Sequence, residues 1–318
     1  MSALPQGLKE AIERYLADNG RGSLVEKTSR MSEIYRQGGQ SGEALDFAAY
    51  LVARLPATIA AVDHCLAELA GRCPQFTPRS LLDAGSGPGT AAWAAIATYP
   101  DISSVTFLDN NEQFLDLARS LAAQSDQLVL RGAGALKADL GNFPSQTRAD
   151  LVIAAYAFAE LPVEQSGKTA VALWQGCEGA LLIIEPGTPQ GFARIKQARA
   201  ALLAEGANLV APCTHANPCP MLAPGWCHFS VRLSRSREHM HAKKATVPFE
   251  DEKFSYLIAS RQPMQPHGAR ILALPRETKS SITFKLCSEN GLLERDIARR
   301  DKAEYKRIRK LAWGDLLE

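Results

Sequence analysis

The stretch LLDAGSGPGT, residues 81–90, decides the fold expected for this chain. Three glycines stand at alternate positions, Gly85, Gly87 and Gly89, between a short apolar run and an Ala-rich helical segment. Glycine adopts positive φ angles and lets the backbone approach a ligand without a Cβ in the way. A strand, a glycine turn and a helix in this order are typical of a nucleotide-type cofactor site, although a purely structural turn would use the same residues.

Outward from the turn, short apolar runs alternate with helical segments over residues 78–205. The alternation predicts an α/β fold with a doubly wound parallel sheet. The strands are expected at residues 80–83, 105–108, 128–130, 150–155 and 180–185. Around this core we expect an N-terminal helical cap (1–77), a Cys-rich metal-binding insertion (206–250), and C-terminal strands of the core with a basic tail (251–318), helical over 293–311.

The GxGxG spacing, in place of GxGxxG, and the acid at Asp83 favour S-adenosylmethionine over a dinucleotide, which remains the alternative. The core is then a Rossmann-like class I methyltransferase sheet. Asp109 ends the next expected strand, where its carboxylate can accept hydrogen bonds from ribose hydroxyls. Asp139 and Leu140 resemble the pair that lines an adenine in such folds. The expected cofactor residues are Asp83, Gly85, Gly87, Gly89, Asp109, Asp139 and Leu140.

No catalytic residue can be identified. The segment AAYAFAE, residues 154–160, follows the fourth expected strand and lacks the Asn/Asp-Pro-Pro-aromatic signature that grips an exocyclic amine. The pairs Pro212-Cys213 and Pro218-Cys219 follow the fifth strand, so a pyrimidine C5 nucleophile is not expected. Methyl transfer from a sulfonium is an in-line displacement, and positioning can carry most of its acceleration.

The charge is unevenly spread. The chain has 318 residues and a net charge of +2, yet residues 231–318 hold 19 Lys and Arg against 12 Asp and Glu. The apolar stretches are shorter than the ~20 residues that span a bilayer. Residues 1–20 carry acids and no apolar core of a secretory signal. We therefore expect a cytoplasmic monomer without a membrane partner.

The seven cysteines divide into two groups. Three stand in apolar or helical surroundings and are expected to be buried small hydrophobes: Cys65, Cys73 and Cys177. Four others are Cys213, Cys219 and Cys227, within fifteen residues, and the distant Cys287. In a reducing compartment a metal or redox site explains such a group better than disulfides do.

Four thiolates can close a Zn²⁺ tetrahedron or bind an iron–sulfur cluster. Structural zinc usually draws its ligands from close C-x2-4-C pairs, and this sequence has none, so the wider spacing favours a cluster. His215 or His228 could replace one thiolate, which leaves a Cys₃His zinc site as the alternative.

Six stretches resemble the methyltransferase-like proteins of the mitochondrial small ribosomal subunit and their bacterial relatives. They are residues 49–61, 82–95, 184–198, 211–232 (APCTHANPCPMLAPGWCHFSVR), 254–261 and 313–315. The resemblance implies a methyltransferase core that acts on, or is bound to, small-subunit ribosomal RNA during assembly. It also implies a 4Fe-4S cluster on Cys213, Cys219, Cys227 and Cys287. The lack of a presequence fits a bacterial member.

Basic residues follow the Cys-rich stretch and recur in the tail. Contacts from such residues to phosphates would give a salt-sensitive affinity for RNA, although a solvated surface would have the same composition. The candidate RNA-binding residues are Arg232, Arg235, Arg237, Lys243, Lys244, Arg299, Lys306 and Arg309. Two functions remain: an S-adenosylmethionine-dependent ribosomal RNA methyltransferase, and a non-catalytic assembly factor of the small subunit with the same fold.

Overall fold

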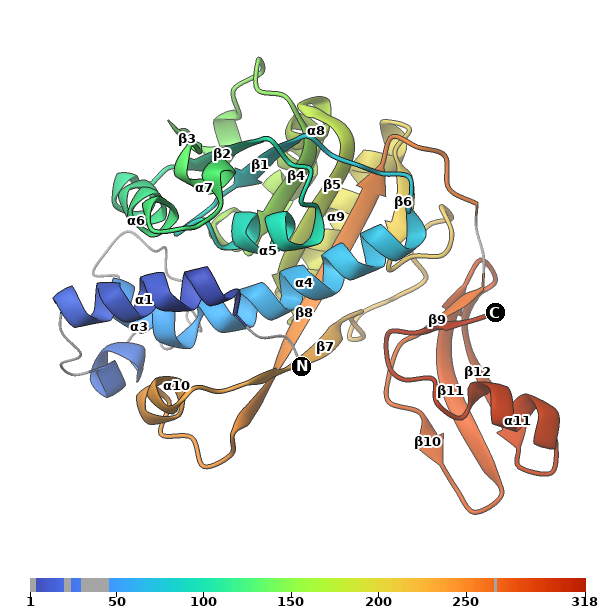
Figure 1. Ribbon diagram of the computed structural model, residues 1–318. Helices are drawn as coiled ribbons and strands as arrows, with labels where there is room; N and C mark the ends of the chain where they lie inside the picture. The colour runs from blue at the N-terminus through green and yellow to red at the C-terminus, as the bar shows by residue number, and fades with distance from the viewer. Residues whose placement is uncertain (1–3, 20–23, 30–45, 266–267) are drawn as a thin grey trace.

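The computed structural model describes residues 4–19, 24–29, 46–265 and 268–318 (Figure 1). Parts of the expected helical cap, at 1–3, 20–23 and 30–45, lie outside the described residues. The described part of the cap contains α1 (Gln6–Asn19), a helical segment at 24–29, α3 (Phe47–Ala53) and α4 (Leu55–Arg72). Pro56 lies in the first turn of α4, where its missing N–H costs nothing.

The core is a mixed sheet with the strand order β3-β2-β1-β4-β5-β8-β6, and β7 pairs with β8. The first five strands are parallel, whereas β8 runs antiparallel to β5, β6 and β7. This is the Rossmann-like arrangement of class I methyltransferases. The strands are β1 (Ser80–Ala84), β2 (Ser104–Asp109), β3 (Gly134–Lys137), β4 (Ala149–Ala155), β5 (Cys177–Pro186), β6 (Asn208–Ala211), β7 (Phe229–Ser234) and β8 (Phe249–Ser260).

Helices cover both faces of this sheet (Figure 1). On β5, Leu182 and Ile184 face the cluster that contains α4, α5 and α6, whereas Leu181 and Ile183 face α8 and α9. Burial on both faces explains why β5 is a continuous apolar run. The remaining helices of the core are α5 (Thr90–Thr98), α6 (Glu112–Ala123), α7 (Leu128–Arg131), η1 (Leu140–Asn142), η2 (Phe158–Glu160), η3 (Val163–Gln165), α8 (Ser166–Gln175), α9 (Pro189–Ala204) and α10 (Arg237–Ala242).

One expected strand of the core is wrong. The apolar run at 128–130 forms the short helix α7, and the third strand is β3, a few residues later. A run this short does not distinguish helix from strand by its periodicity. Residues 206–250, expected as a Cys-rich insertion, contain β6 and β7, which both pair with β8 of the core sheet.

A second, five-stranded sheet follows the core and lies to its lower right in Figure 1. Of residues 251–318, expected as core strands with a basic tail, the part in β8 does belong to the core sheet, whereas most of the remainder forms this second sheet. The expected helix at 293–311 is also wrong: β12 pairs with β11 along its whole length, and only α11 is helical. The elements are β9 (Ala269–Ile271), β10 (Arg276–Glu277), β11 (Ser281–Ser288), β12 (Gly291–Ala298), α11 (Lys302–Ile308) and β13 (Leu316–Leu317).

Within the described residues, no helix has the length and apolar character needed to cross a membrane.

Candidate functional site

The glycine turn lies at the carboxyl end of β1 and is fixed by its neighbours. The backbone N–H groups of Gly85 and Ser86 donate to the carbonyl of Leu108, at 2.7 and 2.9 Å. Gly85 has φ +71°, and a Cβ placed on it would lie 2.4 Å from the Cβ of Ala157. Packing and backbone conformation together therefore require glycine here.

Gly87 stands in more open surroundings at the centre of the turn. A Cβ there would meet only the hydroxyl of Tyr50, at 3.6 Å. Its N–H donates to Oδ2 of Asp109 at 2.8 Å, and Oδ1 of Asp109 accepts from the N–H of Asn111 at 2.9 Å. The expected ribose acceptor thus also holds the turn. Each carboxylate oxygen has a second lone pair, so further hydrogen bonds remain possible.

Asp83 is buried at the start of α5. Its side chain is 1% exposed, and Oδ2 accepts from the N–H of Ala92 at 3.1 Å, in the first turn of α5. Burial raises the pKa of Asp83 to about 8. At neutral pH this carboxyl is largely protonated, and its described contact is to the start of the helix.

Asp139 and Leu140 follow β3 and have different surroundings. Asp139 is exposed, and Oδ1 accepts from the N–H of Gly141 at 2.6 Å, which caps η1. Leu140 is buried, and its Cδ1 lies 3.4 Å from the position of a Cβ on Gly85. The carboxyl ends of β1, β2 and β3 therefore bring Gly85, Asp109 and Leu140 together.

Aromatic residues of α3 cover this edge, and sequence reasoning missed them. The rings of Phe47 and Tyr50 each lie 5.3 Å, centroid to centroid, from the ring of Phe114 in α6. The hydroxyl of Tyr50 faces Gly87. The spacing of Phe47 and Tyr50, three residues apart on a helix, is the sequence signal that could have indicated a shared face.

At the carboxyl end of β4, Tyr156 anchors a polar network. It has φ +62°, a left-handed conformation that is rare outside glycine. Its hydroxyl donates to Oε1 of Glu252 at 2.7 Å, and Arg54 binds the same oxygen at 3.1 Å. The guanidinium of Arg54 lies over the Tyr156 ring, 4.2 Å from its centroid. Sequence reasoning could not join three residues so far apart in the chain.

Burial raises the pKa values of both titratable groups at the ends of β4 and β5. Burial and the Glu252 carboxylate raise the pKa of Tyr156 well above its ordinary value, so the phenol keeps its proton. Burial raises the pKa of Glu185 to about 8. Oε1 of Glu185 accepts from the N–H of Phe158 at 3.0 Å and so fixes the turn after β4.

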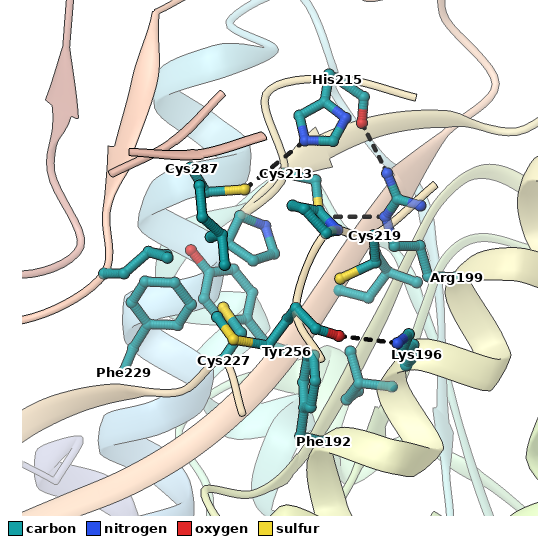
Figure 2. Close-up of a pocket in the computed structure, with 17 residues that line it drawn as sticks. Phe192, Lys196, Arg199, Cys213, His215, Cys219, Cys227, Phe229, Tyr256 and Cys287 are labelled. Carbon is teal, nitrogen blue, oxygen red and sulfur yellow. Dashed lines mark hydrogen bonds between the residues drawn. The ribbon is translucent and has the colours of Figure 1, made fainter. Parts of the chain in front are cut away.

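The four expected metal ligands line one cavity of about 40 Å³ (Figure 2). We call it the four-cysteine cavity. Cys213 follows β6, Cys219 lies in the loop, Cys227 precedes β7, and Cys287 comes from β11 of the second sheet. Much of the remaining lining is aromatic or aliphatic, as in Phe192, Ile195, Phe229, Tyr256, Leu257 and Leu292, and Lys196, Arg199 and His215 also line the cavity. The other three cysteines are buried, as expected.

Two buried arginines flank this cavity. Nε of Arg199 donates to Sγ of Cys213 at 3.3 Å, and its Nη2 donates to the carbonyls of His215 and Asn217 at 2.9 and 2.8 Å (Figure 2). Arg270, on β9, is 2% exposed and binds the carbonyl of Pro212 at 2.9 Å. The second sheet, the Cys-rich loop and α9 therefore meet at the cavity through buried polar contacts.

Three of the four thiols are weaker acids than an ordinary cysteine, because they are buried. Burial raises the pKa values of Cys213, Cys227 and Cys287, to about 11 for Cys287. Nε2 of His215 lies 3.7 Å from Sγ of Cys287, whereas His228 is stacked against Trp226 and is not part of the lining. Among the described residues, no three His, Cys, Asp or Glu side chains converge as a single metal ion requires.

The candidate RNA-binding residues of the β7–β8 region are mostly ion-paired. Arg232 pairs with Asp251 at 2.7 Å. Arg235 and Lys243 both pair with Glu250, at 3.4 and 2.7 Å. The two remaining candidates, Arg237 and Lys244, are exposed and form no salt bridge within the described part of the chain.

The candidates of the tail do not all lie on one helix, because the helix expected over 293–311 is not formed. Arg299 precedes α11, pairs with Glu277 at 3.3 Å and lies over the ring of Tyr305. Lys306 and Arg309 are exposed in and after α11. Because α11 begins only at residue 302, Arg299 is outside the helix.

Two curated relatives illustrate what the chain is similar to. The ribosome assembly protein METTL17, mitochondrial, from Homo sapiens is 29% identical over 288 residues, covering 84% of this chain and 61% of that protein. The Rsm22-cox11 tandem protein 2, mitochondrial, from Schizosaccharomyces pombe is 26% identical over 288 residues, covering 74% of this chain and 38% of that protein. The chain spans less than two thirds of the length of either relative.

Solved methyltransferases have a similar but distant structure. Magnesium protoporphyrin IX methyltransferase from Synechocystis PCC 6803, with bound SAH, has a TM-score of 0.45 and 16% identity, over 74% of this chain and 95% of that chain. Precorrin-6y C5,15-methyltransferase from Geobacter metallireducens has a TM-score of 0.39 and 15% identity, over 63% and 88%. At these scores the fold is identified by the strand order and not by the likeness.

The expected cytoplasmic location is wrong. It depended on the residues at the start of the sequence, whereas both relatives are named as mitochondrial proteins.

One family model covers most of the chain. It is described as mitochondrial small ribosomal subunit Rsm22 and matches residues 44–318. The match includes the core sheet, the four-cysteine cavity and the second sheet. The chain therefore belongs to the Rsm22 family of the mitochondrial small ribosomal subunit.

Proposed function

We propose that this chain is an assembly factor of the small ribosomal subunit that binds ribosomal RNA. Its methyltransferase-like core would keep a site for S-adenosylmethionine, and an iron–sulfur cluster would join its two sheets. The observation that carries the non-catalytic reading is the network of Tyr156, Arg54 and Glu252 at the carboxyl end of β4. A relative named as a ribosome assembly protein supports the same reading.

The network argues against a general base beside the cofactor. A general base must be unprotonated near the operating pH, and it must lie within hydrogen-bond reach of the proton that it removes from the methyl acceptor. Tyr156 stays protonated, and its hydroxyl donates a hydrogen bond to Glu252. Arg54 forms a salt bridge with the same carboxylate. Both donors bind Oε1 of the Glu252 carboxylate, and a guanidinium covers one face of the Tyr156 ring.

The carboxyl edge of β1 to β3 supports binding of S-adenosylmethionine. Gly87 is open to close approach, Asp109 carries spare acceptor lone pairs, and Leu140 offers an apolar surface beside the turn. Phe47 and Tyr50 of α3 pack on Phe114 beside this edge. Asp83 and Asp139 would act indirectly, by holding α5 and η1.

The donor set of the four-cysteine cavity supports a 4Fe-4S cluster held by Cys213, Cys219, Cys227 and Cys287. Four thiols line one mainly apolar cavity, and thiolates alone are the ligands that such a cluster requires. Bonds between the bound iron and the four thiolates would cross-link the loop between β6 and β7 to β11. The buried cation of Arg199 would offset part of the negative charge that four thiolates bring.

The RNA-binding surface would comprise the exposed cations that are not neutralised by a neighbour. These are Arg237, Lys244, Lys306 and Arg309. Arg232, Arg235, Lys243 and Arg299 are paired with carboxylates and would contribute less. Phosphate contacts of this kind give an affinity that falls steeply with salt.

The test combines RNA binding with methyl transfer. Purified protein, with its metal content determined, is titrated with transcribed small-subunit ribosomal RNA and then incubated with radiolabelled S-adenosylmethionine. Salt-sensitive binding without incorporation of label supports the assembly factor. Absence of RNA binding at low salt contradicts it.

A ribosomal RNA methyltransferase is the second candidate, because the glycine turn and Asp109 are retained. A native precursor particle of the small subunit is its proper substrate, since free RNA lacks the assembled shape. Label transferred to the RNA of such a particle, and lost in Gly87→Ala, would favour the enzyme.

A further inference from the structure

Three aromatic rings form an assembly near the end of β5 that the proposed function does not yet use. The indole of Trp226 is stacked on the imidazole of His228, with centroids 5.2 Å apart and planes inclined by 19°. The ring of Trp313, near the C-terminus, meets the other side of the group edge-on, 5.0 Å from His228. Residues 226–228 and 313 are thus brought together from two distant segments.

Backbone hydrogen bonds fix both indoles. Nε1 of Trp226 donates to the carbonyl of Gly187 at 3.0 Å, and Nε1 of Trp313 donates to the carbonyl of His228 at 3.1 Å. A ring held in this way loses little conformational freedom when it binds a ligand. Rigidity therefore distinguishes this group from an ordinary exposed side chain.

Trp226 nevertheless remains accessible. It is 37% exposed, although His228 covers one face of its indole and its N–H is hydrogen-bonded to the carbonyl of Gly187. Among the large hydrophobic residues that are exposed in the described part of the chain, it is the one aromatic. The exposed area must come from the remaining face and edges of the ring.

The surroundings of Trp226 are polar and cationic. Gly187, which accepts its N–H, also donates to the carbonyl of Lys253 at 2.9 Å. Lys253 is exposed, forms no salt bridge with any described residue, and pairs with Ser230 across the β7–β8 ladder. Arg232 lies two residues further along the same face of β7 and pairs with Asp251.

The opposite face of β7 is buried, which leaves this face open. Phe229 and Leu233 are 1% and 2% exposed, and Leu233 packs against Ala57 and Ala60 of α4. Side chains alternate along a strand, so Ser230 and Arg232 point away from α4. The result is a strand face that runs from a fixed aromatic ring to two cations.

We infer that Trp226, supported by His228 and Trp313, is a stacking platform for one unpaired base of RNA, and that Lys253 contacts the adjoining phosphate. The inference rests on the proposed RNA-binding function and names the part of the RNA that is recognised. Aromatic rings flanked by cations bind single-stranded nucleic acid in this way, without selecting a particular base. An apolar protein segment fits less well, because the neighbours on this face are serine, lysine and arginine.

The test measures binding of a fluorescein-labelled oligouridine to the full-length, metal-loaded protein. Trp226→Ala should weaken binding about fivefold or more, whereas Trp226→Phe should stay within about twofold of wild type, since a phenyl ring still stacks. Lys253→Ala should weaken binding and lower the slope of log Kd against log salt by about one. Leu222→Ala, an exposed residue of the same loop, is the matched control and should bind as wild type does.

Iron content is determined for each variant, because Trp226 neighbours Cys227. If Trp226→Ala loses iron, tryptophan fluorescence of wild type and of Trp226→Phe is measured in its place. Oligouridine should quench the emission of wild type, and this quenching should be largely lost in Trp226→Phe. Unchanged affinity in an iron-replete Trp226→Ala, or equal quenching in Trp226→Phe, overturns the platform and favours a protein contact at this surface. If wild type itself binds no RNA, the proposed function fails instead.

Discussion

The glycine turn and the four-cysteine cavity differ in what holds them together. At the turn, backbone N–H groups bond to Leu108 and Asp109, and a carboxyl beneath it holds α5, so the chain satisfies its own polar groups. At the cavity, three thiols of the loop between β6 and β7 and one thiol of β11 line a common space of about 40 Å³. At the turn the polar groups are therefore satisfied within the chain, whereas we propose that the four-cysteine cavity is completed by a bound cluster.

The largest expected effect is at the cavity. Cys219→Ser removes one proposed ligand, and we expect nearly complete loss of bound iron, because thiolates are required for the cluster. Residues 212–228 contain little buried apolar surface, so their amides should exchange much faster. Iron analysis and hydrogen exchange measure both effects. Cys73→Ser, a buried cysteine away from the cavity, is the control and should retain iron.

The pH dependence of stability tests the carboxyl edge of the core sheet, where Glu185 is buried at the end of β5. Its pKa is about 8 in the folded chain and near 4.5 when unfolded, so the folded chain binds an extra proton between these values. The free energy of unfolding should therefore fall as the pH rises from about 5 to 9, on the order of a few kcal/mol. Denaturant titrations at several pH values measure it. In Glu185→Gln this decline should be smaller but not abolished, because burial raises the pKa of Asp83 to about 8 as well. An identical decline would show that Glu185 does not contribute to it.

Substitutions in the turn separate packing from ligand access. Gly85→Ala adds a methyl group 2.4 Å from Ala157 at a positive φ, and should cost about 2–4 kcal/mol of unfolding free energy. Gly87→Ala meets only the Tyr50 hydroxyl at 3.6 Å, and should cost about 1–2 kcal/mol from its backbone conformation alone. Denaturation and calorimetry with S-adenosylmethionine distinguish the two. We expect both variants to retain iron, because the glycine turn and the four-cysteine cavity are separate sites. Loss of iron in either folded variant would contradict this.

The smallest expected effect concerns the network at β4. Glu252→Gln removes a carboxylate that raises the pKa of Tyr156, so that pKa should fall toward its ordinary value. The salt bridge with Arg54 is also lost, at a cost of about 1 kcal/mol. Ultraviolet titration of tyrosine ionisation, compared between variant and wild type, measures the shift. No difference in the titration would mean that burial alone sets the pKa.

Much of the core was predictable because its signals are local. The GxGxG turn lies between β1 and α5 as expected, and the apolar runs of β2, β4 and β5 are strands, because both faces of the sheet are buried. The third strand and the tail were not predictable. Residues 128–130 and 293–298 have patterns that suit helix or strand, and their partners decide between the two.

The candidate sites divide in the same way. Spacing and residue type alone indicated the four cysteines, and they do line one cavity. Arg199, Arg270 and Glu252 were invisible to sequence reasoning, since an isolated Arg or Glu is most often a surface residue. Their burial follows from contacts between segments up to 198 residues apart, such as Arg54 with Glu252.

The sequence by itself determined the strand–turn–helix cofactor motif, the alternation of the core and the identity of the four thiols. These depend on residue type and short spacing, which fix local backbone conformation and chemistry. Only the tertiary structure decided that Cys287 reaches the other three cysteines, that Asp109 also holds the turn, and that Trp226, His228 and Trp313 form one assembly. Those pairings arise from the packing of distant segments, where many weak contacts together select one arrangement.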